Sequence, residues 1–546
     1  MYNGSLYFFA FIRTKLYPLK YSPLHISPSS TTTPFTHALV RTFTLRSVTL
    51  ADECIANFRN QPHSEPNLQT MVAVAPLYTS QNWRTTRVPK HFKFRQAITS
   101  PPISRVPTEI LCKFFTNFLS EDDSLPPQTC PRPLISLRCY SDPTILGQVC
   151  SHWRRVALNL PSLWSTIYIC DPSKSHFYLT KLWLERAGGQ PLNLSLAATQ
   201  WRREDMDLHS AFAILSLFLS YSASWRSLDL RLRDVHMGTM QKLVQSALPC
   251  SNLESIKFNV RSSPTHKSGW ESAYVDDIWS FFNSSPALRS VDLTTKFDGL
   301  VLGHTPFHQL KTINIHFAVS IPEAIALLRQ FTAIENVTFG SLDVQTPLER
   351  HALNHSLVME YLQILKIDTL LDLTPLFNQL SLPSLRVIDI SQRLNEHYPQ
   401  AGAAFAHLLS RSGCHLDTFN FRNLDIHEDD LKTYILTPAL TWLRQLHLSV
   451  RLISTDTLAL FVERNDTGGH SLMPHLEDLV LGQCRTSDGM LSDLIISRWH
   501  RSEEGRGGYL KTFRPWCDGG LGPVDLECMK KFADLGNSTF NSTCYC

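Results

Sequence analysis

A short apolar motif that recurs through about half of the chain is the strongest constraint on its fold. The motif reads apolar-x-x-apolar-x-apolar, and successive copies start 22 to 35 residues apart. Because neighbouring side chains of a strand point to opposite faces, the fourth and sixth positions face a core, and the third and fifth face away from it. An incomplete eleventh copy runs from Leu510 to Phe513. The ten complete copies are Trp225–Leu230, Leu253–Phe258, Leu288–Leu293, Leu310–Ile315, Ile334–Phe339, Leu362–Ile367, Leu385–Ile390, Leu416–Phe421, Leu443–Leu448 and Leu476–Leu481.

Helical apolar spacing separates several copies. A unit of strand, loop and helix is one layer that cannot bury its own core, so neighbouring units must stack. The period and the strand signature resemble those of leucine-rich repeats, which implies an α/β solenoid with parallel strands inside and helices outside. Variable spacing makes it irregular, and an ordinary α/β domain is the alternative. The helix-like stretches are Phe212–Tyr221, Met240–Leu248, Pro322–Phe331, Phe405–Leu409 and Leu458–Val462.

The fifth positions of the copies form a candidate face for binding a target protein. Their side chains are mostly short, polar and mixed in sign, as on a concave protein-binding surface, and also as on any solvated strand surface. Asp292 and Asp389, with Lys257 and Lys366 nearby, offer alternating charge to a polar partner. No aromatic row for stacking nucleic-acid bases occurs. The candidate residues are Lys257, Asp292, Asn314, Lys366, Asp389, Asn420 and His447.

Upstream of the repeats, residues from Val106 to Trp164 predict a small all-α module. Pro107 suits the start of a helix, and Glu109 suits the first turn, where the helix dipole favours a carboxylate. Two short helices cannot bury all of their apolar residues against each other, which predicts a partner site; packing on the following domain is the alternative. The residues at helical spacing are Ile110, Leu111, Phe114, Phe115 and Phe118 in one helix, and Val149, Cys150, Trp153, Val156 and Ala157 in the next.

The same segment resembles the F-box, through which proteins dock on the Skp-type adaptor of a cullin ubiquitin ligase. Val-Pro-x-Glu-Ile-Leu, Phe-Phe and Val-Cys-x-x-Trp carry the resemblance, and the Pro-rich insertion at 120–143 is similar to that of F-box families expanded in mushroom-forming fungi. The resemblance implies a substrate receptor with an adaptor, and through it a cullin, as partners. A repeat scaffold without a ubiquitin role is the alternative. The implied adaptor-binding residues are Pro107, Glu109, Ile110, Leu111, Phe114, Phe115, Val149, Cys150 and Trp153.

These patterns divide the chain into five segments. Residues 1–100 are expected to be a disordered leader, since prolines break any amphipathic helix there; a mitochondrial targeting segment is a lesser alternative, suggested by the lack of acidic residues before Asp52. The F-box module is expected at 101–170, a connecting helix at 171–190, the solenoid at 191–520, and a tail or cap at 521–546.

Composition narrows the function further. A net charge of +3, from 51 basic and 48 acidic residues, gives no case for nucleic acid or an anionic membrane. No apolar run is long enough to span a bilayer. The 13 scattered cysteines indicate a reducing compartment, cytoplasmic or nuclear. Phosphate-binding, H-E-x-x-H and G-x-S-x-G motifs are absent, so we expect a non-catalytic protein without cofactor or metal.

Overall fold

The computed structural model describes the chain in separate ranges, all within the unit Thr99–Cys546. The predicted leader and most of the Pro-rich insertion lie outside these ranges, and so does the end of the chain. The described residues are 106–120, 143–198, 208–261, 272–294, 306–343, 356–393, 398, 400–464, 470–499, 510–517 and 520–534.

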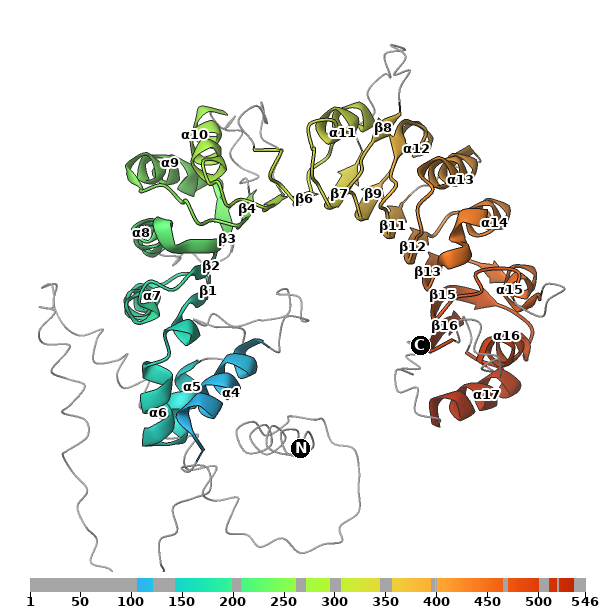
Figure 1. Ribbon diagram of the computed structural model, residues 1–546, viewed down its shortest axis with the longest axis horizontal. Coiled ribbons are helices and arrows are strands. Elements are labelled where there is room, and N and C mark those ends of the chain that lie inside the picture. The colour runs from blue at the N-terminus through green and yellow to red at the C-terminus, as the bar shows by residue number, and fades with distance from the viewer. Residues whose placement is uncertain are drawn as a thin grey trace, which may run out of the picture. The chain divides into compact units, whose positions relative to one another are not determined.

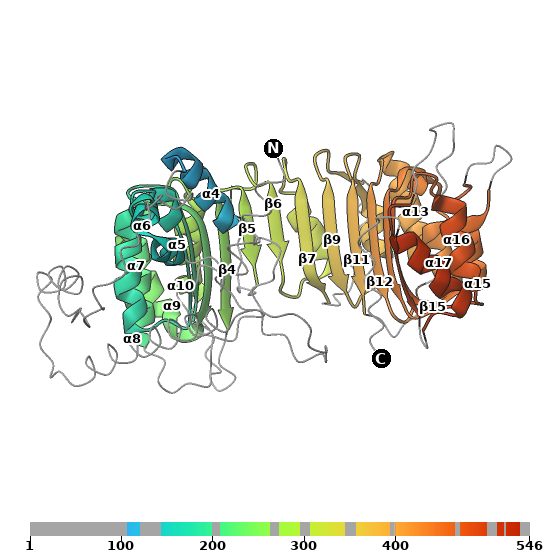
Figure 2. The same cartoon turned by 90° about the horizontal axis from the view of Figure 1, so that it is seen from below.

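The unit is α/β and is built on one sheet of 14 parallel strands. Most strands pair with the strands that precede and follow them, so the sheet grows in chain order (Figures 1 and 2). Strands β8 (Leu357–Val358) and β10 (Leu380–Ser381) form a separate two-stranded parallel sheet. The strands of the large sheet are β1 (Thr166–Cys170), β2 (Leu192–Ala197), β3 (Trp225–Arg233), β4 (Ser255–Arg261), β5 (Ser290–Leu293), β6 (Thr312–Ile315), β7 (Asn336–Leu342), β9 (Ile364–Thr369), β11 (Val387–Gln392), β12 (Thr418–Asn423), β13 (Gln445–Val450), β14 (Ile453–Ser454), β15 (Asp478–Arg485) and β16 (Thr512–Cys517).

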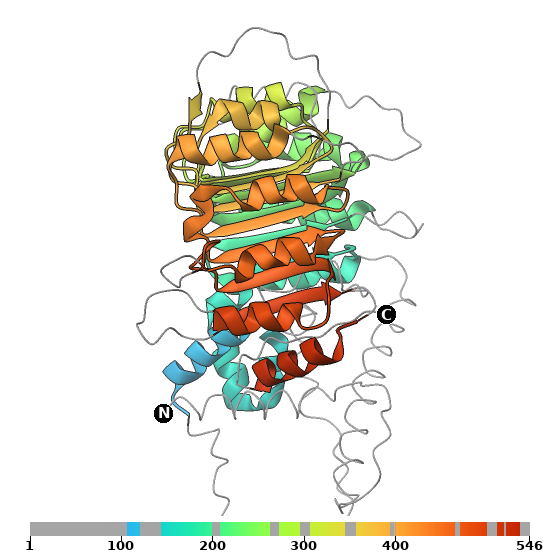
Figure 3. The same ribbon diagram turned by 90° about the vertical axis from the view of Figure 1, so that its right-hand side faces the viewer.

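Helices α7 to α16 lie along one face of this sheet, and we call the opposite side the open face (Figures 1 and 3). Local sequence explains individual helices: at α11, Ser320 accepts from the Glu323 amide while the Glu323 carboxylate accepts from the Ser320 amide, a capping box. The helices are α4 (Thr108–Ser120), α5 (Pro143–Val149), α6 (Ser151–Leu158), α7 (Lys174–Ala187), α8 (Leu208–Leu219), α9 (Met237–Ser246), α10 (Ser272–Asn283), α11 (Ile321–Leu328), α12 (Thr374–Gln379), α13 (Gln400–Ser412), α14 (Glu428–Ile435), α15 (Thr455–Val462), α16 (Met490–Trp499) and α17 (Pro523–Asp534).

The core follows the predicted alternation. In all ten complete copies of the motif the first, fourth and sixth positions are buried, and the fifth position is partly or fully exposed. The same applies to Leu510 and Phe513 of the eleventh copy, which leads into β16. The parallel pairing of all these strands confirms the α/β prediction at the level of one parallel sheet covered by helices.

The sheet begins earlier than the sequence analysis expects. Strands β1 and β2 pair in parallel, and the predicted connecting segment 171–190 supplies α7, the crossover helix between them. The first layer of the repeating architecture therefore starts at Thr166, inside the segment assigned to the helical module. Trp164, Ile167 and Ile169 fit the first, fourth and sixth positions of the apolar motif, so the sequence carries the signal of this first layer.

Candidate docking surface

The helical module, residues 106–120 and 143–164, has an aromatic core of its own. Phe115 and Trp153 are fully buried, with ring centroids 5.0 Å apart in an edge-on contact, and Phe114 lies 6.0 Å from Trp153. Leu111 is buried beside them on the inner face of α4. Three of the residues predicted to contact an adaptor, Leu111, Phe115 and Trp153, are thus enclosed by the chain itself, and this corrects their assignment. Their role is to hold α4 against α6.

The second predicted helix is two helices that meet at Cys150. This residue has an extended backbone, with φ −160° and ψ 170°, and its sulfur accepts a hydrogen bond from the Trp153 amide at 3.4 Å. Cys150 therefore caps α6, and the residues before it belong to α5. Apolar spacing alone concealed the break, because Val149 and Trp153 are four positions apart, as on one continuous helix.

Each helix of the module leaves an apolar side chain in contact with solvent. Ile110 of α4 is 54% exposed, Val149 of α5 is 38% exposed and Leu158 of α6 is 41% exposed. Pro107 and Glu109 are also exposed, at the start of α4. We call these five residues the docking surface. Sequence analysis missed Leu158, which lies off the apolar stripe of α6 and follows directly on the buried Ala157.

The module is fixed to the first layer of the sheet by two buried tryptophans. The Trp164 indole N–H donates to the Ala157 carbonyl at 2.9 Å, which ties the short helix Pro161–Trp164 to the end of α6. Its ring meets Trp183 of α7 edge-on at 5.6 Å, and the Arg186 guanidinium lies 4.6 Å from the Trp164 ring. Such a cation–π contact is stabilising, so module and sheet form one continuous packed structure.

The predicted target-binding residues form a single row across the open face. The register places each fifth position opposite the next: Asp229 opposite Lys257, Lys257 opposite Asp292, and so on to β16. The row spans strands that are far apart in sequence, as the spacing predicts. Its members in order are Asp229, Lys257, Asp292, Asn314, Thr338, Lys366, Asp389, Asn420, His447, Val480 and Arg514.

Many charges on the open face are already paired within the chain. Asp292 lies 3.1 Å from the Lys257 ammonium and 3.5 Å from the His316 imidazole. Burial by itself raises the pKa of the Asp292 carboxyl, but the hydrogen bond from His316 and the charge of Lys257 outweigh it and lower this pKa. Asp292 is therefore a carboxylate at neutral pH, and its charge is largely balanced before any partner arrives.

A second carboxylate near the other end of the row is paired in the same way. Asp478 lies 3.4 Å from the His447 imidazole and 3.7 Å from the Arg514 guanidinium. Asn420 donates to Asp389 at 3.4 Å. Lys366, in contrast, is exposed at the centre of the row. The open face is thus a pre-ordered polar surface, on which a partner would meet hydrogen-bonding groups held in place by their neighbours.

Two further findings bear on what this surface can do. Among the described residues no group of three or more His, Cys, Asp or Glu side chains is placed to hold a metal ion. Within the same ranges, no helix has both the length and the apolar character needed to cross a bilayer. In comparisons with known proteins, no family model matches the chain, and no curated protein matches it significantly.

Proposed function

We propose that this chain is a substrate-recognition subunit of a Skp-cullin-F-box type ubiquitin ligase. In this proposal the helical module is an F-box that docks the adaptor, and the repeating sheet is an irregular leucine-rich-repeat-like solenoid that binds a target protein. The docking surface carries the proposal: it sets exposed apolar side chains on a module whose interior is already filled by Phe115 and Trp153. Apolar residues left outside a complete core are a feature of partner sites.

The mechanism would be one of proximity rather than catalysis. A target held on the open face is kept at a high local concentration relative to the ubiquitin-carrying enzyme that the cullin recruits. Trp164 and its contacts support this mechanism, because they join the module to the first layer and keep the two binding surfaces on one body. The thirteen dispersed cysteines favour the cytoplasm, the nucleus or both as the place of action.

Binding to a purified Skp-type adaptor tests the proposal. We expect the full chain to bind, and the double variant Ile110→Asp/Val149→Asp to bind at least about tenfold more weakly, because apolar anchors carry most of the energy of an interface. Ile496→Asp is the matched control, since Ile496 lies on α16 and its exposed fraction of 49% is similar to the 54% of Ile110. Absence of binding by the unaltered chain, or equal loss in the Ile496 variant, would contradict the proposal.

A repeat scaffold without a ubiquitin role is the second candidate, and one observation favours it. The burial of Leu163 and Trp164 against the first layer is what a terminal cap of a repeat array needs. The two candidates differ in a single measurement. A scaffold would remain monomeric when mixed with adaptor in size-exclusion chromatography, whereas a receptor would elute as a complex of both chains.

A further inference from the structure

Two cysteine side chains meet where the last two long strands of the sheet run side by side. Cys484 of β15 and Cys517 of β16 are opposite each other in the parallel register. The two thiols are close enough for each to influence the ionisation of the other. Opposite residues on paired strands lie about 4.8 Å apart, and a disulfide spans Cα separations of about 4.4–6.8 Å. The backbone therefore already holds the two cysteines at a separation that a disulfide can bridge.

A bulge in β15 creates this opposition. Leu481 pairs with Pro515, but Gln483 pairs with Trp516, so Gly482 is an extra residue in β15. If the register of the first half continued, Cys484 would lie opposite the residue that follows Cys517. Gly482 suits this position because a Cβ there would lie 2.6 Å from the Val450 carbonyl oxygen. The close approach of β13 and the pairing of the thiols thus depend on the same glycine.

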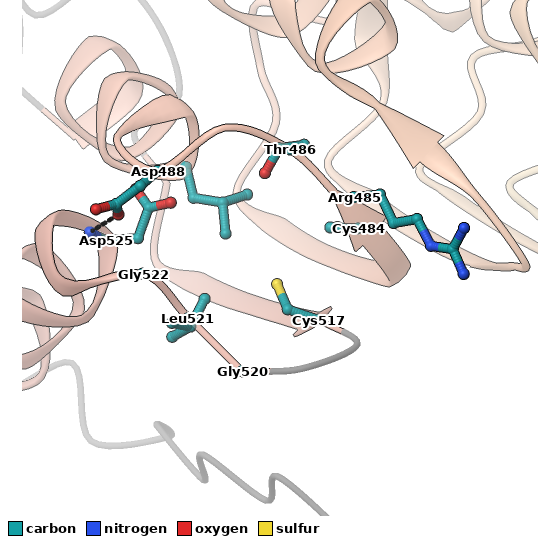
Figure 4. Close-up of a pocket in the computed structure, with 10 residues that line it drawn as sticks. Cys484, Arg485, Thr486, Asp488, Cys517, Gly520, Leu521, Gly522 and Asp525 are labelled. Carbon is teal, nitrogen blue, oxygen red and sulfur yellow. Dashed lines mark hydrogen bonds between the residues drawn. The ribbon is translucent and has the colours of Figure 1, made fainter.

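Both cysteines line a pocket beside the start of α17 (Figure 4). Its volume is about 190 Å³, which is several times the roughly 30 Å³ that a water molecule takes up in the liquid. A molecule as small as hydrogen peroxide fits this space. Cys517 is partly exposed, whereas Cys484 is buried and donates to the Gly482 carbonyl at 3.1 Å. The partly exposed Cys517 is therefore the first thiol that a reagent in the pocket would meet.

The two thiols differ in reactivity as well as in access. The neighbouring Cys517 thiol, together with burial, raises the pKa of the Cys484 thiol well above its ordinary value. Since the thiolate is the reactive form, Cys484 alone is a poor nucleophile toward reagents in solution. It lies, however, directly beside the sulfur that is accessible from the pocket.

We propose that Cys484 and Cys517 are an oxidation site at which a peroxide converts the two thiols into a disulfide between β15 and β16. The Cys517 sulfur attacks one oxygen of hydrogen peroxide, which forms a sulfenic acid and releases the other oxygen as water. The Cys484 sulfur then attacks the sulfenic sulfur, the S–S bond forms and a second water leaves. Two thiols lose two electrons and two protons in total, and one peroxide accepts them.

The bond would fasten the end of the sheet. Within the described ranges β16 pairs with β15 alone, and α17 is the next element along the chain. The start of α17 is held by Asp488, whose carboxylate accepts from the amides of Val524 and Asp525 at 3.2 and 3.0 Å. A covalent link to β15 would add to these hydrogen bonds and oppose detachment of β16 and α17 as a terminal piece.

Peptide mapping by mass spectrometry tests the proposal on the full reduced chain treated with hydrogen peroxide. We expect a linked peptide pair containing Cys484 and Cys517, formed within one chain, removed by dithiothreitol and accompanied by loss of two alkylatable thiols. Cys517→Ala should abolish the linked pair. Cys528→Ala, at a partly exposed cysteine on α17, is the matched control and should leave it unchanged.

A second measurement avoids substitutions altogether. Phenylarsine oxide bridges two adjacent thiols, so it should protect Cys484 and Cys517 from alkylation together in the unaltered chain. Links formed only between chains, or oxidation of Cys528 without a linked pair, would overturn the proposal. So would alkylation of Cys517 at an undiminished rate in the presence of the arsenical.

Discussion

At the scale of single residues, the surroundings of α16 show how a buried charge controls its neighbours. The Arg498 guanidinium is buried and donates to three backbone carbonyls, those of Phe461 at 2.7 Å, Met473 at 3.0 Å and Leu472 at 2.6 Å. These carbonyls belong to segments that leave the regular elements, so the side chain replaces the hydrogen bonds that a strand or helix would supply. One arginine thereby closes a junction between α15, α16 and the loop before β15.

His470 lies beside this arginine and should make stability depend on pH. Its Nε2 lies 3.0 Å from the Ser497 carbonyl oxygen, and burial, followed by the Arg498 charge, lowers the pKa of the imidazole from 6.5 to about 4. Between these two values the unfolded chain binds a proton that the folded chain does not. The His470 contribution to the free energy of unfolding is therefore present near neutral pH and is lost as the pH falls from 6.5 toward 4.

We expect His470→Gln to reduce the acid sensitivity of the fold. The amide can still donate to Ser497 but has no proton to take up, so the difference between melting temperatures at pH 7 and pH 4.5 should be smaller in the variant. Thermal melts followed by circular dichroism measure this difference. Equal pH dependence in both proteins would show that His470 does not titrate in this window.

At the scale of elements, the sequence locates most strands but not the faces of the first helix. The strands were predictable because leucine, isoleucine, valine and phenylalanine recur at the buried positions of every copy. On α4, Ile110 and Leu111 are both apolar and occupy adjacent stripes of the helix. Only packing decides that Leu111 turns inward and Ile110 stays exposed. The sequence therefore predicts that the module has more apolar residues than its core can bury, while the packing of the folded chain decides which of them stay exposed.

The earlier start of the sheet has a similar explanation. Before β2 the first motif position is occupied by Pro191 instead of a large apolar residue. This proline interrupts the motif, although Leu194 and Leu196 of β2 pair with its fourth and sixth positions in β3. The partner strand β1 begins two residues after Trp164, which from the sequence resembles the end of a helical module.

The bulge in β15 leads to a prediction about the strand itself. Gly482→Ala would place a methyl group 2.6 Å from the Val450 oxygen and 2.7 Å from its nitrogen, both backbone atoms. We expect a loss of about 1–3 kcal/mol in the free energy of unfolding, the usual cost of overpacking.

Gly238→Ala is the control for this substitution. Gly238 lies in α9 with no atom within 4 Å of the added methyl position, so alanine should stabilise by about 0.5–1 kcal/mol. Urea denaturation measures both effects. A neutral result at Gly482 would mean that β13 moves aside without cost.

At the scale of the whole described unit, the order of strand pairing makes stability local. Most strands contact only the strands before and after them, so a defect should weaken its own layer and the adjacent layers more than remote ones. Phe532 of α17 is fully buried against the last layer, and Phe218 of α8 is buried near the first layers. These two phenylalanines allow the same chemical change to be made at both ends of the sheet.

Hydrogen exchange should reveal this locality. We expect Phe532→Ala to speed amide exchange in β15, β16 and α16 and to leave β3 and β4 protected, since each lost ring removes packing only from its own surroundings. Phe218→Ala should give the reverse pattern. Faster exchange throughout the sheet in either variant would instead mark the unit as a single cooperative structure.

The step-by-step pairing of the strands also bears on how such a chain can change over generations. Duplication or deletion of one strand–helix segment would lengthen or shorten the sheet by one strand, and the strands on either side would pair in the same parallel register. The helical module and α17 would stay at the two extremities. Such steps would change the length of the open face and leave the helical module unaltered.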